Sequence, residues 1–358
     1  MLRGAATSRS RNLRPRPPLS SRHTPRRPIL TPSPPAGPSP HRVAVVINAA
    51  SGTALGRDTI EAEVMRHLAA AGVEAVLVPD HAEGLLARLD EAVAMGAQAV
   101  VVGGGDGSIA AAAARLMGGE AALGILPLGT MNLLAKDLGI PLPLEAAAAA
   151  LAQGTIRAID VADVNEHVFL CSSVLGSPSW LGRHRERGRG KRGLRPRLVF
   201  ILAALRSEWR HRPMRLSVRL GEGRTVRLWT RALAVANNRY AEGFGLMMTR
   251  PRLDAGELAL YVARRYGTWW WVKMIAGMFL GTWRGSRLVQ ERTAQQVTIG
   301  SARTAIRVMN DGEALLIPPP LVYRIHPGAL RVIVPGPPAE DPPAGTDPLP
   351  RASAPPVA

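Results

Sequence analysis

The sequence lacks the features that mark several protein classes. It has a single cysteine, Cys171, so neither an intramolecular disulfide nor a cysteine zinc cluster can form. Its eight histidines show no metal-ligand spacing, and no run of about 18 uninterrupted apolar residues is present. The first 40 residues also contain no apolar core of the kind that a secretory signal needs. We therefore expect a protein of the reducing cytosol that has no simple membrane-spanning helix.

Acidic residues are absent from the first 42 residues, which contain nine arginines. The segment from Arg183 to Arg197 has eight basic side chains and one acid, Glu186. These two segments carry +16 of the net charge of +18, so the rest of the chain is nearly neutral. The second segment has no Trp, Tyr or Phe to stack on bases. We therefore do not expect a nucleic-acid partner.

Both ends of the chain are rich in proline. Residues 1–41 alternate Pro, Arg and Ser and cannot bury enough apolar surface to offset the entropy of ordering. We predict a disordered basic tail there and a second disordered tail over residues 336–358. A targeting peptide is the alternative at the N-terminus, but its prolines oppose an amphipathic helix.

Residues 42–160 alternate between short apolar runs and helical stretches. Strands are expected at residues 43–47, 73–78, 99–102 and 123–126, with helices at 57–71, 82–95 and 108–117. This alternation predicts an α/β domain built on a parallel sheet with helices on both faces.

Residues 161–310 have a different sequence pattern. Short strand-like runs separated by turns occur at 215–220, 224–228, 232–236, 258–262, 296–299 and 303–309. They predict a mostly antiparallel β-sandwich, interrupted by helical insertions near residues 198–209 and 268–283.

A glycine-rich loop follows the valine run at residues 100–102 and opens a helix. Glycines at the end of a strand let backbone N–H groups approach phosphates, and the helix N-terminus adds its positive dipole end. An acid in such a loop can order Mg²⁺ against the phosphates. An ordinary strand-to-helix turn is the alternative. The loop consists of Gly103, Gly104, Gly105, Asp106, Gly107 and Ser108.

Other glycine loops do not fit this chain. No Gly-x-Gly-x-x-Gly opens the first βα unit, and no lysine follows the glycines as in a Walker loop. A second loop lies in residues 124–141, where Gly129 allows a tight turn. Thr130 offers a hydroxyl to a nucleotide, and Asn132 can begin the next helix. A plain helix cap is the alternative at this loop.

The first loop resembles the Gly-Gly-Asp-Gly-Thr motif of the diacylglycerol kinase catalytic-domain family, with Ser108 in the last place. This family includes bacterial soluble lipid kinases and the sphingosine and ceramide kinases. The same motif occurs in NAD kinases and 6-phosphofructokinases. Residues 124–141, 310–313 and 326–335 resemble further motifs of the lipid kinases, so the resemblance covers residues 43–335.

The resemblance implies a nucleotide-binding domain followed by a β-sandwich, with residues 311–335 returning to the first domain. ATP and Mg²⁺ are the implied cofactors. Glu313 is the implied proton acceptor for the lipid hydroxyl, although an Asp-Gly pair before it also suits a hairpin turn. Asp160 is the implied contact to the acceptor head group, with a solvent-facing strand end as the alternative. Asn48 and Gly52 match the family's first loop.

The sequence departs from the family at two acidic positions. Leu133 follows Asn132 where many bacterial relatives have Asp, and Ala255 stands where an acid of a structural magnesium site would fall. We therefore assign no metal ligands, and Asp254, next to Ala255, is the candidate to substitute for the missing acid.

We therefore expect an ATP-dependent lipid kinase, and diacylglycerol is the expected acceptor, which would give phosphatidic acid. The Trp-rich stretch of residues 266–284 and the basic residues 183–197 would contact the membrane surface and anionic phospholipid headgroups. We expect a cytoplasmic enzyme bound peripherally to the inner face. Alternatives are packing of the Trp-rich stretch in the core, a solvated basic loop, a kinase of a soluble acceptor such as NAD, and a non-catalytic nucleotide or anionic-polymer binder.

Overall fold

The computed structural model describes residues 42–49, 59–80, 84–176, 213–241, 249–263 and 289–336. Several sequence predictions fall outside these residues: the tails at 1–41 and 337–358, Gly52, the basic segment 183–197, and the helical and Trp-rich insertions at 198–209 and 266–284.

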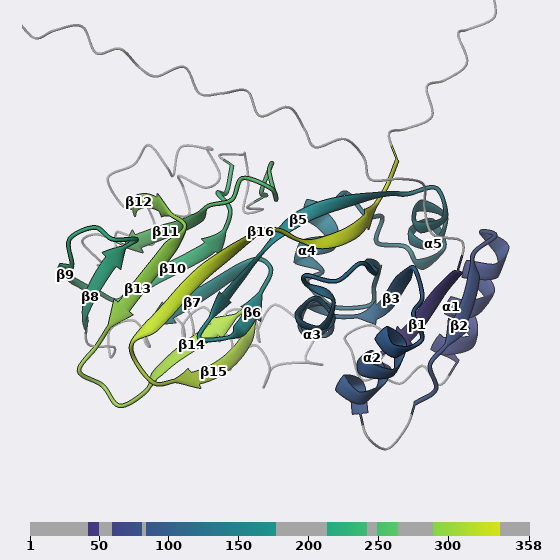
Figure 1. The fold of residues 1–358 in the computed structure, drawn as a ribbon, viewed down its shortest axis with the longest axis horizontal. Helices are drawn as coiled ribbons and strands as arrows, with labels where there is room; N and C mark the ends of the chain where they lie inside the picture. Colours follow the sequence, from purple (N-terminus) through teal and green to yellow (C-terminus); the bar gives the residue numbers. More distant parts are fainter. Residues whose placement is uncertain are drawn as a thin grey trace, which may run out of the picture. The chain divides into compact units, whose positions relative to one another are not determined.

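The first part of the chain forms a parallel sheet with helices packed on it (Figure 1). Its strands lie in the order β2-β1-β3-β4, and all their pairings are parallel. The elements are β1 (Arg42–Ile47), α1 (Ile60–Ala70), β2 (Glu74–Leu77), α2 (Gly84–Ala94), β3 (Ala99–Gly104), α3 (Asp106–Leu116), β4 (Ala122–Pro127), α4 (Leu133–Asp137) and α5 (Leu144–Ala152).

Burial on both faces explains why these strands are continuous apolar runs. Every residue of β3 and β4 is buried, as is every residue of β1 after Arg42. Helices α1, α2, α3 and α5 contribute the other side of this core through residues spaced three or four apart, such as Ile60, Val64 and Leu68 in α1. The carboxyl ends of the parallel strands are therefore the edge at which loops can hold a ligand.

The second part is a sandwich of two sheets. The ten-stranded sheet continues from β4 into β16 (Leu321–Val334), β13 (Gln296–Gly300), β8 (Met214–Leu220) and β9 (Val226–Thr230), with β5 (Thr155–Val164) and β6 (His167–Phe169) joined at β16. The six-stranded sheet has the order β12 (Val289–Ala294), β11 (Leu258–Ala263), β10 (Ala232–Asn237), β7 (Ser172–Gly176), β14 (Ile306–Asn310) and β15 (Glu313–Ile317).

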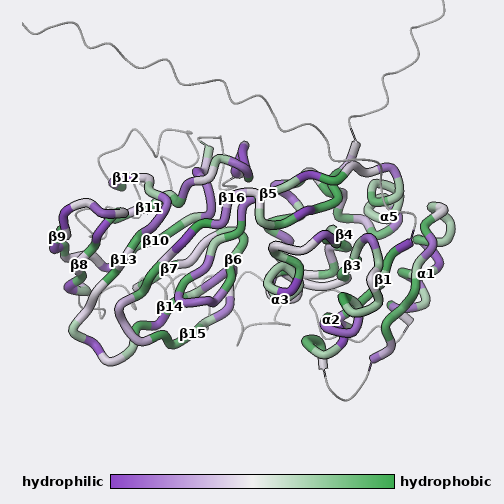
Figure 2. The backbone as a smooth tube through the Cα atoms, viewed as in Figure 1, coloured by the Kyte–Doolittle hydropathy of each residue, from purple (hydrophilic) through white to green (hydrophobic). Residues whose placement is uncertain are grey.

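A shared apolar core holds the two sheets together. Val218 and Tyr323 from the ten-stranded sheet lie in one buried cluster with Leu233 and Leu258 from the six-stranded sheet. Strand β8 alternates buried and exposed residues, as expected for a sheet with one face on the core. Figure 2 shows this alternation of hydrophobic and hydrophilic residues along the strands of the sandwich. The predicted fold class, an α/β domain with a mostly antiparallel β-sandwich, is confirmed.

The predicted boundary at Asp160 falls inside a continuous strand. β5 runs from Thr155 to Val164 and pairs antiparallel with β16 along its length, apart from a shift between His326 and Leu330. Val332 of β16 also pairs parallel with Leu123 of β4. Two long strands thus pass from one part to the other, and no linker separates them. Among the described residues, no helix has the length and apolar character required to cross a membrane.

Candidate active site

The glycine loop connects β3 to α3 at the carboxyl edge of the parallel strands. Gly105 is the N-cap of α3 in extended conformation, and the helix begins at Asp106, two residues before the predicted start. The first backbone N–H groups of a helix have no intrahelical acceptor and carry the positive end of its dipole. The start of α3 is therefore suited to an anion such as a phosphate.

Packing within the protein already disfavours a side chain at three positions of the two loops. A Cβ added at Gly104 would lie 2.6 Å from the Cβ of Ser108, and one at Gly129 would lie 2.5 Å from the Cα of Gly105. A Cβ at Gly107 would overlap the carboxylate of Glu313. The glycines alone therefore do not identify a ligand, because a close-packed pair of loops also explains them.

Asn132 shapes the second loop. It adopts the left-handed conformation with φ of 49°, which asparagine tolerates better than most residues. Its Oδ1 accepts a hydrogen bond from the N–H of Gly129 at 2.9 Å, and its Nδ2 donates to the carbonyl of Gly129 at 2.9 Å. Thr130 lies exposed in this loop. The second loop is therefore closed on itself by one side chain.

Asp106 joins the two loops. Its Oδ1 accepts the N–H of Leu133 at 2.6 Å and its Oδ2 accepts the N–H of Asn132 at 3.1 Å, so the carboxylate caps the start of α4. Burial raises the pKa of Asp106 above its ordinary value, although these two N–H groups act in the opposite direction. Leu133 contributes its backbone N–H to this cap.

The predicted first-loop residue Asn48 also contacts the glycine loop. Its Nδ2 donates to Oγ of Ser108 at 2.9 Å, and its backbone N–H donates to the carbonyl of Gly103 at 2.8 Å. The carbonyl of Ile47, the residue before Asn48, accepts a hydrogen bond from the buried Arg88 at 2.9 Å. Sequence reasoning missed Arg88, since a single arginine in a helix gives no signal of burial.

Glu313 reaches the glycine loop from the opposite end of the sequence. It follows a two-residue turn between β14 and β15, in which Asp311 and Gly312 have φ of 47° and 97°. This is the hairpin turn that an Asp-Gly pair favours. The hairpin brings the Glu313 carboxylate against Gly107, at the N-terminus of α3. The hairpin interpretation and the catalytic interpretation of this motif are therefore compatible.

Asp311 fixes the position of that turn. Its carboxylate accepts three backbone N–H groups, from Leu170 at 2.6 Å, Cys171 at 2.9 Å and Ser172 at 2.8 Å. Burial raises the pKa of Asp311, while these three N–H groups oppose the shift. Asp311 thus ties the turn that carries Glu313 to the segment between β6 and β7.

The structure gives Asp160 a different role from the predicted head-group contact. Asp160 is 2% exposed, and its carboxylate accepts the N–H groups of Gly256 at 2.6 Å and Gly328 at 2.9 Å. Both glycines have positive φ, so the acid holds two tight turns together. This geometry does not support a contact to an acceptor.

The predicted substitute metal ligand, Asp254, pairs with arginines. It accepts hydrogen bonds from Arg252 at 3.1 Å and Arg157 at 3.3 Å. Burial acts to raise its pKa, but these two arginines lower it below the ordinary value. Among the described residues, no group of three His, Cys, Asp or Glu side chains is arranged to hold a metal ion. Mg²⁺ in kinases is commonly held by one or two carboxylates together with the nucleotide phosphates, and Asp106 fits that requirement.

A buried ion pair that the sequence did not reveal connects the two parts of the chain. Arg250 donates from Nη2 to Oδ2 of Asp137 at 2.7 Å, and the two side chains are 0% and 7% exposed. Nη1 of Arg250 donates to the carbonyls of Leu170 and Asn237. Asp137 ends α4, whose start Asp106 caps, and Leu170 is held by Asp311. A continuous polar network thus links the nucleotide-loop side to the Glu313 side.

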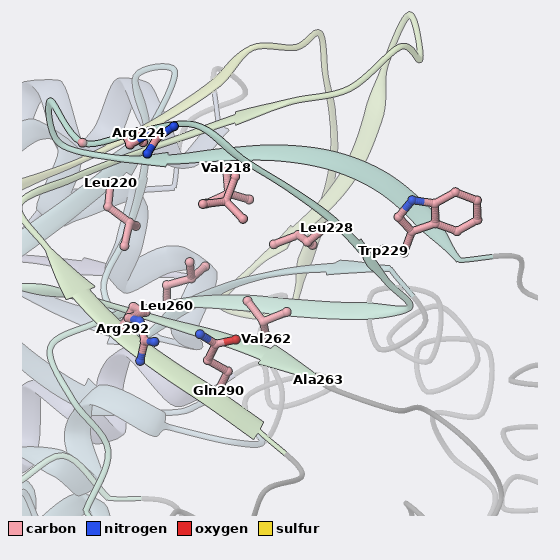
Figure 3. A pocket seen from close by; sticks show the side chains of 12 residues that line it. Val218, Leu220, Arg224, Leu228, Trp229, Leu260, Val262, Ala263, Gln290 and Arg292 are labelled. Carbon is pink, nitrogen blue, oxygen red and sulfur yellow. The ribbon is translucent and has the colours of Figure 1, made fainter. Parts of the chain in front are cut away.

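A separate cavity of about 790 Å³ lies between the sheets of the sandwich (Figure 3). Leu260 of β11 lines this cavity. Successive strand pairings through β10, β7 and β14 connect Leu260 to Glu313 of β15 across the six-stranded sheet. Four steps of about 4.8 Å put these residues roughly 19 Å apart. The cavity is therefore distinct from the site formed by the loops.

Comparison with known proteins finds similarity over most of the chain. Residues 42–164 match the protein-family model "Diacylglycerol kinase catalytic domain", and residues 183–334 match "YegS C-terminal NAD kinase beta sandwich-like domain". A Pseudomonas aeruginosa protein (strain PAO1) named "Probable lipid kinase YegS-like" is 32% identical over 270 residues, covering 71% of this chain and 84% of that protein. A Citrobacter koseri protein of the same name is 41% identical over 92 residues, covering 25% of this chain and 31% of its own length.

Solved structures show the same fold. A diacylglycerol kinase from Bacillus anthracis str. Sterne superposes with a TM-score of 0.57 at 17% identity, covering 82% of this chain and 97% of that one. Another crystal structure from that organism reaches a TM-score of 0.64 at 20% identity with the same coverage.

Proposed function

Because this chain belongs to the YegS-like lipid kinases of the diacylglycerol kinase catalytic-domain family, we propose that it transfers the γ-phosphoryl group of ATP to diacylglycerol. The product is phosphatidic acid. The observation that carries the proposal is the contact between Glu313 and Gly107, because it joins a carboxylate to the loop suited to phosphates.

The roles of the residues follow from this contact. The γ-phosphate would lie at the N-terminus of α3, where N–H groups and the helix dipole favour negative charge. The acceptor hydroxyl would lie between the γ-phosphorus and the Glu313 carboxylate. Its oxygen attacks phosphorus, the bond to the β–γ bridging oxygen breaks, ADP leaves, and the hydroxyl proton passes to Glu313.

Asp106 is the second catalytic residue in this proposal. When Mg²⁺ is bound with the nucleotide, it neutralises charge on the phosphates, and Asp106 is the acid nearest to that position in the loop. Its cap on α4 keeps the loop of residues 129–132 next to the glycine loop. Gly52 and Thr130 remain proposed nucleotide contacts.

The test is transfer of labelled phosphate from ATP to a panel of acceptors. The panel contains diacylglycerol, monoacylglycerol, phosphatidylglycerol, a sphingoid base and ceramide, together with NAD as a soluble acceptor, and mass spectrometry identifies the product. We expect phosphatidic acid from diacylglycerol. Phosphorylation of NAD alone, or ATP binding with no transfer, would contradict the proposal.

A further inference from the structure

The hairpin formed by β8 and β9 carries a one-sided pattern of charge. Between Met214 and Thr230 there are four arginines and one acid, Glu222. Met214, Leu216 and Val218 are buried. The alternate residues of β8 therefore point away from the core, and Arg215 and Arg219 are exposed among them.

Strand pairing places further residues on the same outer face. Arg215 pairs with Trp229, and Ser217 pairs with Arg227. The guanidinium carbon of Arg215 lies 4.2 Å from the centre of the Trp229 ring, whose residue is 64% exposed. We call Arg215, Arg219, Arg227 and Trp229 the hairpin face. Within the described part of the chain, its arginines form no ion pair.

The cavity lies beneath this same hairpin, and Trp229 of the hairpin face also lines it, so the face and the cavity adjoin at the edge strand β9 (Figure 3). Its walls include Leu220 and Leu228 from the hairpin and Val262 from β11. Arg224, from the turn between β8 and β9, and Arg292, from β12, lie at one end. Val226 lines the cavity and is 59% exposed, so the cavity reaches the surface at this edge. β9 and β12 are the edge strands of the two sheets there.

We propose that the hairpin face docks on an anionic phospholipid bilayer. Guanidinium groups bind headgroup phosphates, tryptophan is favoured at the membrane interface, and exposed valine beside an apolar cavity suits acyl chains. Nucleic acid would use the arginines and Trp229 but would gain nothing from Val226 or from an apolar cavity. The net charge of the sequence did not indicate this face, because acidic residues elsewhere in the chain balance the charge of its arginines.

The test measures sedimentation of the 358-residue chain with vesicles. One set of vesicles contains phosphatidylglycerol in phosphatidylcholine, and the other contains phosphatidylcholine alone. The test variant is Arg215→Gln/Arg219→Gln/Arg227→Gln. The matched control is Arg42→Gln/Arg66→Gln/Arg303→Gln, which removes the same charge from other exposed positions.

We expect the hairpin variant to need at least about tenfold more anionic lipid for half-maximal binding, since each arginine near such a surface contributes roughly a fivefold change. The control should stay within about twofold of the unmodified protein, and salt should weaken binding. Equal binding by both variants, or a hairpin variant that loses single-stranded RNA binding but keeps vesicle binding, would overturn the proposal.

Two further measurements keep the result interpretable. The single variants Arg219→Gln and Arg227→Gln should each show part of the loss if the triple variant is unstable. The hairpin variant should keep its turnover on a short-chain diacylglycerol dispersed in water, because the face lies apart from Glu313. A protein that binds vesicles but transfers no phosphate would refute the proposed function and leave the docking surface standing.

Discussion

Breaking the buried pair between Arg250 and Asp137 should destabilise the protein strongly. Arg250→Met leaves the Asp137 carboxylate without its cation in a site where the two side chains are 0% and 7% exposed. Removing one partner of such a pair costs about 3–5 kcal/mol, because the remaining charge stays buried. The carbonyls of Leu170 and Asn237 each lose the hydrogen bond from Nη1 of Arg250, although the Leu170 carbonyl keeps the one from Nδ2 of Asn237. For a folded region that extends from residue 42 to residue 336, this loss of stability corresponds to a fall in melting temperature of about 10 °C.

Urea unfolding with a double-mutant cycle measures the pair directly. Asp137→Asn should also destabilise, and the double variant should cost less than the sum of the two singles by about 0.5–3 kcal/mol. The exposed pair Arg115–Asp90, with side chains 36% and 58% exposed, is the matched control. Its single substitutions should cost about 0–1 kcal/mol. The reasoning fails if Arg250→Met costs no more than Arg115→Met, or if the cycle is additive.

Three other predictions concern the loop and the turn. Gly107→Ala should lower turnover at least about tenfold, because the new Cβ displaces the Glu313 carboxylate. Gly119→Ala is the control. Equal turnover by the two variants would contradict a functional contact between Gly107 and Glu313. Burial raises the pKa of Asp106 above its ordinary value, so activity should rise with pH as this carboxylate ionises. The stability linked to this group should fall over the same interval, because the folded state holds the proton more tightly than the unfolded state. Asp106→Asn should remove that limb of the pH–rate profile. Asp311→Ala should cost roughly 2–4 kcal/mol in urea unfolding, because three backbone N–H groups lose their acceptor; a cost below about 1 kcal/mol would show that the turn does not depend on it.

Strong local patterns explain what the sequence predicted well. The valine run of β3 and the glycines after it define a strand and a helix start by themselves. Strand β11 was expected at residues 258–262 and is observed at Leu258–Ala263 for the same reason. In contrast, β12 (Val289–Ala294) is half-exposed and polar in sequence, so no periodicity distinguishes it from a loop.

Long-range partners explain what the sequence missed. Asp160 was expected to face an acceptor, and its burial depends on glycine N–H groups 96 and 168 residues away. Arg250 and Asp137 are separated by 113 residues, and neither stands out from other charged residues along the chain. The partner of an isolated charge is fixed by tertiary structure, so only the coordinates identify it.

Glu313 carries the central claim, and one substitution tests it most directly. Transfer of labelled phosphate from ATP to diacylglycerol in mixed micelles should fall by about a hundredfold or more in Glu313→Gln, since general-base assistance contributes about 10²–10⁴-fold. Nucleotide affinity and melting temperature should change little, because the side chain is exposed and the turn is held by Asp311. A Glu313→Gln protein that keeps its full rate of transfer would contradict the account.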